Sequence, residues 1–127
     1  MQPKKNILVV DDDRVLVAWM SEQLRARGFN VVVGFDAMQA IMAAQRTPLS
    51  AVLLDVQMPG GTGLEVLKRL KSSTKTRNVP IIVVTGSIEP DFAWNVTALG
   101  ADAVLFKPVE FDELHHVLCQ SMDKSYA

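Results

Sequence analysis

The feature that most constrains the fold is the alternation of short apolar runs with longer segments of helical periodicity. Five runs rich in Val, Ile, Leu and Ala recur along the chain, at residues 7–10, 31–33, 51–54, 81–84 and 103–106. Strands that alternate with helices favour βα units, in which the strands are parallel and helices cover both faces of the sheet. Runs without polar residues are typical of strands buried on both faces. The sequence therefore predicts an α/β fold around a parallel sheet.

The segments between the runs carry the signals of amphipathic helices. In the first segment Leu16, Met20 and Leu24 recur every four residues, which predicts one buried helix face. Residues typical of helix boundaries flank these segments. Helix starts are indicated by Asp13, Asp36 and Thr62, and helix ends by Gly28, Pro48 and Gly100. We expect the fourth helix at about residues 91–99 and the fifth from Phe111 onwards.

Length and composition limit the organisation of the chain. Its 127 residues match the usual size of one domain, so we expect a single domain over residues 1–127, with a core at about 6–122 and a C-terminal tail at 123–127. No apolar run approaches the roughly 20 residues of a membrane helix, and the N-terminus lacks a signal-peptide pattern. These observations predict a cytoplasmic protein without a membrane partner. A net charge of −1 disfavours direct nucleic-acid binding, because no basic surplus is available to neutralise phosphates.

Polar residues end four of the five apolar runs. They are Asp11 and Asp12 after the first run, Asp55 after the third, Thr85 after the fourth and Lys107 after the fifth. In an open α/β sheet the carboxyl ends of the strands line the ligand crevice, so we expect these side chains to converge. Three carboxylates and one lysine leave an excess of negative charge, which a hard divalent cation such as Mg²⁺ would neutralise.

Asp55 is the candidate nucleophile of this cluster. Beside a metal ion, a carboxylate can accept a phosphoryl group and form an aspartyl phosphate. Lys107 would offset the charge of one phosphoryl oxygen and Thr85 would donate a hydrogen bond to another. Gly86 would leave space for the group, and Pro108 would hold Lys107 at the crevice.

Four motifs resemble those of the response-regulator receiver family, the CheY-like phosphoacceptor domains of two-component signalling. They are Ile-Leu-Val-Val-Asp-Asp-Asp at 7–13, Leu-Leu-Asp-Val-Gln-Met-Pro-Gly at 53–60, Val-Val-Thr-Gly at 83–86 and Leu-Phe-Lys-Pro at 105–108. The resemblance extends from Ile7 to about Met122. It implies a flavodoxin-like (βα)5 doubly wound fold with the strand order 2-1-3-4-5.

The resemblance also implies a function. Asp55 would receive a phosphoryl group from a sensor histidine kinase or a histidine phosphotransfer protein, and the chain would be a signalling switch, not an enzyme. The implied site residues are Asp11, Asp12, Asp55 and the backbone carbonyl of Gln57 for Mg²⁺, and Asp55, Thr85 and Lys107 for the phosphoryl group. The fourth helix, fifth strand and fifth helix would form the face for an output partner or a second copy. Exposure of Trp94 would indicate such a partner surface.

One position departs from the family pattern and two other functions stay open. Val104 stands three residues before the lysine, where an aromatic residue is usual, which leaves the aromatic part of the switch open. The chain could instead be a degenerate receiver that serves only as a docking module. A phosphatase of the haloacid-dehalogenase type uses similar groups, but it needs an acid two residues after the nucleophile, where this chain has Gln57.

Overall fold

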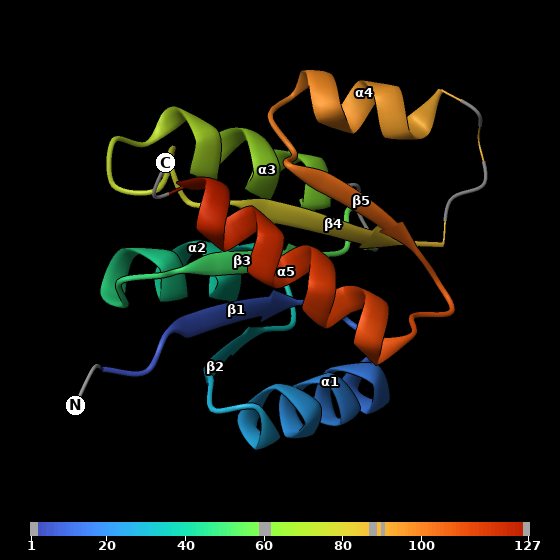
Figure 1. The fold of residues 1–127 in the computed structure, drawn as a ribbon. Coiled ribbons are helices and arrows are strands. Elements are labelled where there is room, and N and C mark those ends of the chain that lie inside the picture. Colours follow the sequence, from blue (N-terminus) through green and yellow to red (C-terminus); the bar gives the residue numbers. More distant parts are fainter. Residues whose placement is uncertain (1–2, 59–61, 87–88, 90, 126–127) are drawn as a thin grey trace.

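The computed structural model describes residues 3–58, 62–86, 89 and 91–125. Strands and helices alternate along them (Figure 1): β1 (Asn6–Val10), α1 (Arg14–Ala26), β2 (Asn30–Gly34), α2 (Ala37–Arg46), β3 (Ala51–Leu54), α3 (Thr62–Ser72), β4 (Ile81–Thr85), α4 (Phe92–Ala98), β5 (Ala103–Phe106) and α5 (Phe111–Ser125). Each of the five apolar runs forms a strand, as predicted. Residues 59 and 60, at the end of one motif, lie outside the described residues.

The strands form one parallel sheet in the order β2-β1-β3-β4-β5. This result confirms the flavodoxin-like (βα)5 arrangement. The register aligns the strand ends, since Val10 pairs with Gly34 and Leu54, and Thr85 pairs with Phe106. The residues that follow β1, β3 and β5 therefore lie along one edge of the sheet.

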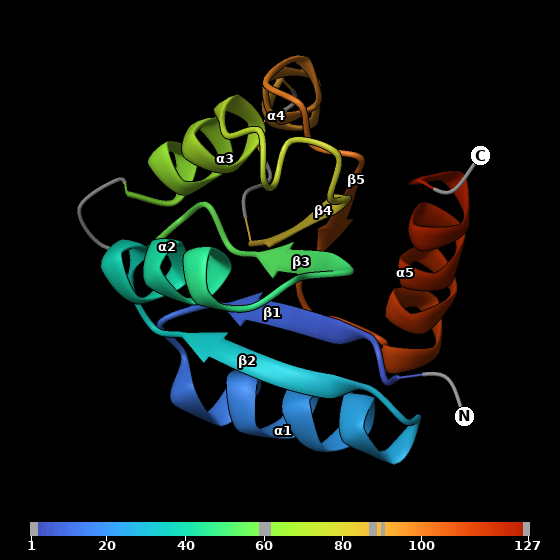
Figure 2. The same cartoon turned by 90° about the vertical axis from the view of Figure 1, so that its left-hand side faces the viewer.

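Helices cover both faces of the sheet (Figures 1 and 2). Side chains of α2, α3 and α4 pack on one face, and those of α1 and α5 pack on the other. Successive strand residues point to opposite faces, so Leu8 and Val10 of β1 belong to the first core and Ile7 and Val9 to the second. Because both cores are apolar, the central strands carry no polar face.

Local capping explains where the helices begin and end. The Asp13 side chain accepts two backbone hydrogen bonds at 3.1 Å in the first turn of α1, and Asp36 accepts one at 2.8 Å in α2. Gly28 and Gly100 follow α1 and α4 with positive φ values of 91° and 110°, as helix stops require. These predictions are confirmed. Helix α3 begins at Thr62, whose predicted capping side chain lies outside the described residues.

Two helices differ in length from the sequence-based expectation. Helix α4 is slightly shorter, and α5 continues to Ser125, through positions expected to form a tail. No Gly or Pro interrupts α5, and Met122 is buried in its last turns. Packing of Met122 therefore stabilises the helix through these positions. Within the described residues, no helix combines the length and the apolar character needed to cross a membrane.

Candidate functional site

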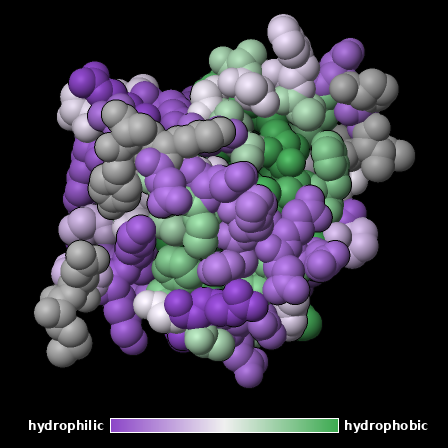
Figure 3. All heavy atoms as spheres, viewed as in Figure 1, coloured by the Kyte–Doolittle hydropathy of each residue, from purple (hydrophilic) through white to green (hydrophobic). Residues whose placement is uncertain are grey.

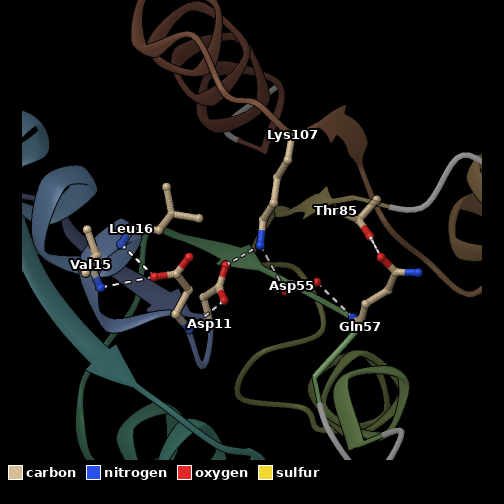
Figure 4. Close-up of polar contacts among 8 residues, drawn as sticks. Asp11, Val15, Leu16, Asp55, Gln57, Thr85 and Lys107 are labelled. Atoms are coloured by element: carbon tan, nitrogen blue, oxygen red, sulfur yellow. Dashed lines mark hydrogen bonds and ion pairs between the residues drawn. The ribbon is translucent and has the colours of Figure 1, made fainter.

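The predicted polar residues converge at the carboxyl edge of the sheet (Figure 4). Asp11 and Asp55 follow the neighbouring strands β1 and β3, and the Asp55 amide donates to the Val10 carbonyl at 2.9 Å. Lys107 follows β5, and its amide donates to the Thr85 carbonyl at 2.8 Å. Ladder hydrogen bonds therefore place residues from distant parts of the sequence beside one another, as expected from the strand ends.

One ammonium group bridges two buried carboxylates. Lys107 Nζ lies 2.8 Å from Asp11 Oδ2 and 3.1 Å from Asp55 Oδ2. Asp11 is 3% exposed and Asp55 is 5% exposed, so water screens neither charge well. A single positive charge cannot neutralise both carboxylates, and this edge of the sheet retains a negative potential.

The surroundings shift the pKa values of Asp55 and Lys107. Burial raises the pKa of Asp55 above its ordinary value, against the opposing hydrogen bonds from the Gln57 amide and Lys107. Burial lowers the pKa of Lys107, but its contacts with Asp11 and Asp55 outweigh that effect, and the pKa ends above its ordinary value. Lys107 is therefore protonated at neutral pH.

The second oxygen of each buried carboxylate accepts a backbone hydrogen bond from its own loop. Asp55 Oδ1 accepts from the Gln57 amide at 2.8 Å, and Asp11 Oδ1 accepts from the Asp13 amide at 3.0 Å. A side-chain oxygen bonded to the amide two residues on forms a compact local turn. These turns and Lys107 together hold both carboxylates in fixed orientations.

Three carboxylates at this edge could hold a metal ion. Asp11, Asp12 and Asp55 each offer an oxygen, and these oxygens all lie within 4.8 Å of one another. Asp12 is exposed, unlike its two partners, so the group opens toward solvent. Hard divalent cations prefer carboxylate and carbonyl oxygens, and Mg²⁺ in particular keeps several water ligands. The buried negative charge and the open side of the group fit such an ion.

Thr85 has a partner that the sequence reasoning missed. Its side chain is fully buried, and Oγ1 donates a hydrogen bond to Gln57 Oε1 at 3.1 Å (Figure 4). The sequence interpretation gave Gln57 a backbone ligand role, placed no contact between its side chain and Thr85, and assigned the Thr85 hydroxyl to a phosphoryl group. The available signal was the position of Gln57 two residues after Asp55, because that loop must face the end of β4. The hydroxyl is therefore engaged by an amide in this state.

Gly63 lets α3 approach the loop that carries Asp55. A Cβ atom on Gly63 would lie 2.3 Å from the Val56 Cα atom and 2.6 Å from the Val56 carbonyl carbon. Neither atom can move without displacing the backbone next to Asp55. The absence of a side chain at Gly63 is thus a requirement of the site.

Gly63→Ala should lower the free energy of unfolding by about 1 kcal/mol. Overpacking against Val56 should cost about 2 kcal/mol, and the gain of about 1 kcal/mol in helix propensity offsets part of that cost. Urea unfolding followed by circular dichroism measures the change. Gly86→Ala is the matched control, because the nearest atom would lie 3.8 Å from the added Cβ. Equal stability of the two variants would contradict the contact with Val56.

A hydrophobic surface lies on another side of the molecule, over β5 between α4 and α5 (Figure 3). Trp94 of α4 is 77% exposed and Phe106 of β5 is 50% exposed. Val104, the position where the family usually has an aromatic residue, is partly buried. A contiguous exposed apolar surface is typical of a binding site. The sequence analysis took exposure of Trp94 as an indication of a partner surface, and Trp94 is exposed.

Comparisons with known proteins agree with this geometry. The model of the response regulator receiver domain matches residues 7–119. The chain is 39% identical over 109 residues to the transcriptional regulatory protein CpxR of Escherichia coli, covering 85% of this chain and 45% of CpxR. It is 36% identical over 108 residues to the probable transcriptional regulatory protein TcrX of Mycobacterium tuberculosis, with the same coverage of 85% and 45%. The chain therefore spans less than half the length of these relatives.

Solved structures show the same similarity. The chemotaxis protein CheY4 of Vibrio cholerae superimposes with a TM-score of 0.88 and 27% identity, over 94% of this chain and 99% of that one. The receiver domain of the sensor histidine kinase PA1611 from Pseudomonas aeruginosa superimposes with a TM-score of 0.85 and 28% identity, over 95% and 99% of the two chains. That structure has a magnesium ion coordinated in its active-site cleft.

Proposed function

The chain belongs to the response regulator receiver domain family of two-component signalling, and from this membership we propose that Asp55 is its phosphoacceptor. One observation carries the proposal: Asp55 is buried at the end of β3, within 3.1 Å of the Lys107 ammonium and beside two further carboxylates. A receiver domain is a signalling domain. We propose that its chemistry is limited to gaining and losing one phosphoryl group.

In the proposed reaction, an oxygen of Asp55 attacks the phosphorus atom of a phosphohistidine. The P–N bond breaks, the imidazole leaves with the electron pair, and Asp55 becomes an acyl phosphate. The negative charge is then on the phosphoryl oxygens instead of the Asp55 carboxylate, so the Lys107 ammonium should pair with one of these oxygens. The ammonium is already bonded to Asp55 at 3.1 Å, so a small movement of a flexible side chain lets it pair with such an oxygen.

We propose that Asp11, Asp12, Asp55 and the backbone carbonyl of Gln57 hold Mg²⁺. Three of these ligands already have oxygens within 4.8 Å of one another, and Mg²⁺ in the similar domain of PA1611 supports the choice of ion. When bound, Mg²⁺ would offset the charge of the phosphoryl oxygens. Asp13 is excluded from the ligand set, because its carboxylate caps α1.

The direct test is incubation with acetyl phosphate and Mg²⁺, read by intact mass under conditions that preserve acyl phosphates. The protein should gain one phosphoryl group, and hydroxylamine should remove it. A degenerate receiver that serves only as a docking module would gain none. A phosphatase would instead release phosphate from esters over many turnovers, which Gln57 disfavours because an amide cannot protonate a leaving group.

We propose that the single domain works in the cytoplasm through protein partners. The donor is a sensor histidine kinase or a histidine phosphotransfer protein, which receiver domains of this family meet. The output partner, or a second copy of the chain, binds the face of α4, β5 and α5, where Trp94 and Phe106 are exposed. These residues carry no positive charge, and this supports a protein partner rather than direct contact with nucleic acid.

Phosphorylation should promote dimerisation through that face. With beryllofluoride and Mg²⁺ as a phosphoryl mimic, the wild type should elute earlier in size-exclusion chromatography at micromolar concentration. Trp94→Asp should stay monomeric, because it places a charge in the centre of an apolar contact. Ala18→Asp on α1, also exposed, is the matched control and should behave as the wild type. An unchanged elution volume of the wild type would contradict dimerisation.

Gln57→Ala should bind beryllofluoride several-fold more tightly than the wild type. The Thr85 hydroxyl must leave Gln57 Oε1 before it can donate to a phosphoryl oxygen, and a neutral hydrogen bond contributes about 1 kcal/mol, or about fivefold in affinity. Titration of tryptophan fluorescence measures the affinity. In a Thr85→Val background the same Gln57→Ala substitution should change nothing. A Gln57 effect that persists there would show that the hydrogen bond is not its cause.

A further inference from the structure

A groove runs between α2 and α3, on the face of the sheet that these two helices cover. Its volume is about 480 Å³, and its walls include Met38, Ile41 and Met42 of α2 and Glu65, Val66 and Arg69 of α3. Figure 2 shows the two helices side by side on the same face of the sheet. A smaller hollow of about 70 Å³ continues it toward Lys75 and shares Ile41 and Arg69. We call these two hollows together the α2–α3 groove.

Exposed methionines line the α2–α3 groove. Met38 is 73% exposed and Met42 is 39% exposed, and the two residues lie one helical turn apart. Neither residue contributes to the core of the fold or to the phosphoacceptor site. A methionine side chain is unbranched and polarisable, which suits it to contact with apolar partners of varied shape. Solvent-exposed methionines along a groove therefore indicate a surface that binds an apolar segment of a partner.

Basic side chains outnumber acidic ones along the α2–α3 groove, where Arg69 and Lys75 line the walls together with Glu65. Between residues 37 and 80 the sequence has six basic residues but only two acidic ones, Asp55 and Glu65. Asp55 is buried in the site, and Lys71 is paired with Asp102 at 3.2 Å. The remaining basic side chains are exposed, and they are Arg46, Lys68, Arg69, Lys75 and Arg77. They lie in the C-terminal halves of α2 and α3 and in the segment that follows α3, and two of them, Arg69 and Lys75, line the groove itself.

We propose that the α2–α3 groove binds one helix of a partner protein, whose apolar stripe is flanked by Asp and Glu. An amphipathic helix in a groove between two helices is bound through apolar side chains at positions i, i+3, i+4 and i+7. Here Met38, Ile41 and Met42 supply apolar contacts with the same spacing. Arg69 and Lys75, which line the groove, supply the charge complement for acidic flanks. The residues that line this surface are distinct from Asp55 and the other residues of the candidate site.

The test uses a synthetic helical peptide of about four turns, with leucines at i, i+3, i+4 and i+7 and glutamates on both flanks. Its fluorescence anisotropy should show saturable binding to the full chain, and amide NMR shifts should change mainly in α2 and α3. Met38→Glu and Arg69→Glu should each weaken binding at least fivefold. Ala18→Glu on α1 adds the same kind of charge at an exposed position elsewhere and should leave binding unchanged.

A second peptide with lysines in place of the glutamates separates the charge contribution from the apolar one. It should bind the wild type more weakly than the acidic peptide, and Arg69→Glu should reverse that preference. Absence of saturable binding, or shifts centred on α4 and α5, would overturn the proposal. Binding of anionic lipid vesicles with the same sensitivity to Met38→Glu would also overturn it in favour of a membrane surface. Concentration-dependent dimers abolished by Met38→Glu would overturn it in favour of a second copy.

Discussion

Asp55→Asn is expected to abolish phosphoryl incorporation from acetyl phosphate, with no gain of phosphoryl mass under conditions in which the wild type is modified. The amide oxygen of asparagine is a poor nucleophile and carries no negative charge, so the acyl phosphate cannot form. The substitution preserves the shape of the side chain and one acceptor oxygen, so the hydrogen bond from the Gln57 amide can persist. The fold should therefore survive, and circular dichroism checks that it does.

Asp123→Asn is the matched control for this experiment. It removes the same charge from an exposed position near the end of α5, and it should gain phosphoryl mass as the wild type does. Equal incorporation by Asp55→Asn and the wild type would show that another residue is the acceptor. Peptide mapping after borohydride reduction of the acyl phosphate would then identify that residue.

Lys107→Met is expected to lower the free energy of unfolding in metal-free buffer by about 2–3 kcal/mol. Removal of one partner from a buried ion pair typically costs about 3–5 kcal/mol, because the remaining charge is left uncompensated, and partial exposure of Lys107 reduces that cost. Here two carboxylates are left, Asp11 and Asp55, and both are almost fully buried. Methionine keeps most of the volume of the lysine stem, so lost packing contributes little.

Added Mg²⁺ should stabilise Lys107→Met more than it stabilises the wild type. A ligand that binds only the folded state raises stability with the logarithm of its concentration relative to Kd, and the affinity for a cation should rise when the competing ammonium is removed. Urea unfolding at a series of Mg²⁺ concentrations measures both effects. Lys4→Met, at an exposed position before β1, should show neither. If Lys107→Met were as stable as the wild type in chelator, the bridge would not be a stabilising interaction.

The alternation of strands and helices could be predicted because it depends on local pattern. Apolar runs at residues 51–54 and 81–84 form strands buried on both faces, and nothing outside each run is needed to see this. The residues of the candidate site could be picked out from the sequence for a similar reason. Asp55 and Lys107 each follow directly after a strand, and all strands of a parallel sheet end at the same edge.

Contacts between distant segments could not be predicted in this way. The Lys107 ammonium reaches Asp11 across 96 residues of sequence, and its simultaneous contact with Asp55 depends on β1 and β3 being neighbours. The side-chain hydrogen bond from Thr85 to Gln57 depends on how the loop after β3 lies against β4. Neither set of contacts corresponds to a hydropathy pattern that can be read in the sequence.

The sequence by itself determined the elements and the chemical groups of this protein, since hydropathy periodicity and the position of a residue at a strand end are properties of short segments. Only the tertiary structure decided which charges pair, which hydroxyl is engaged and which helix faces stay open. Strand register and helix packing set these distances, and they arise from segments that meet only when the chain is folded. The α2–α3 groove is an example, because its walls come from helices on either side of β3 in the sequence.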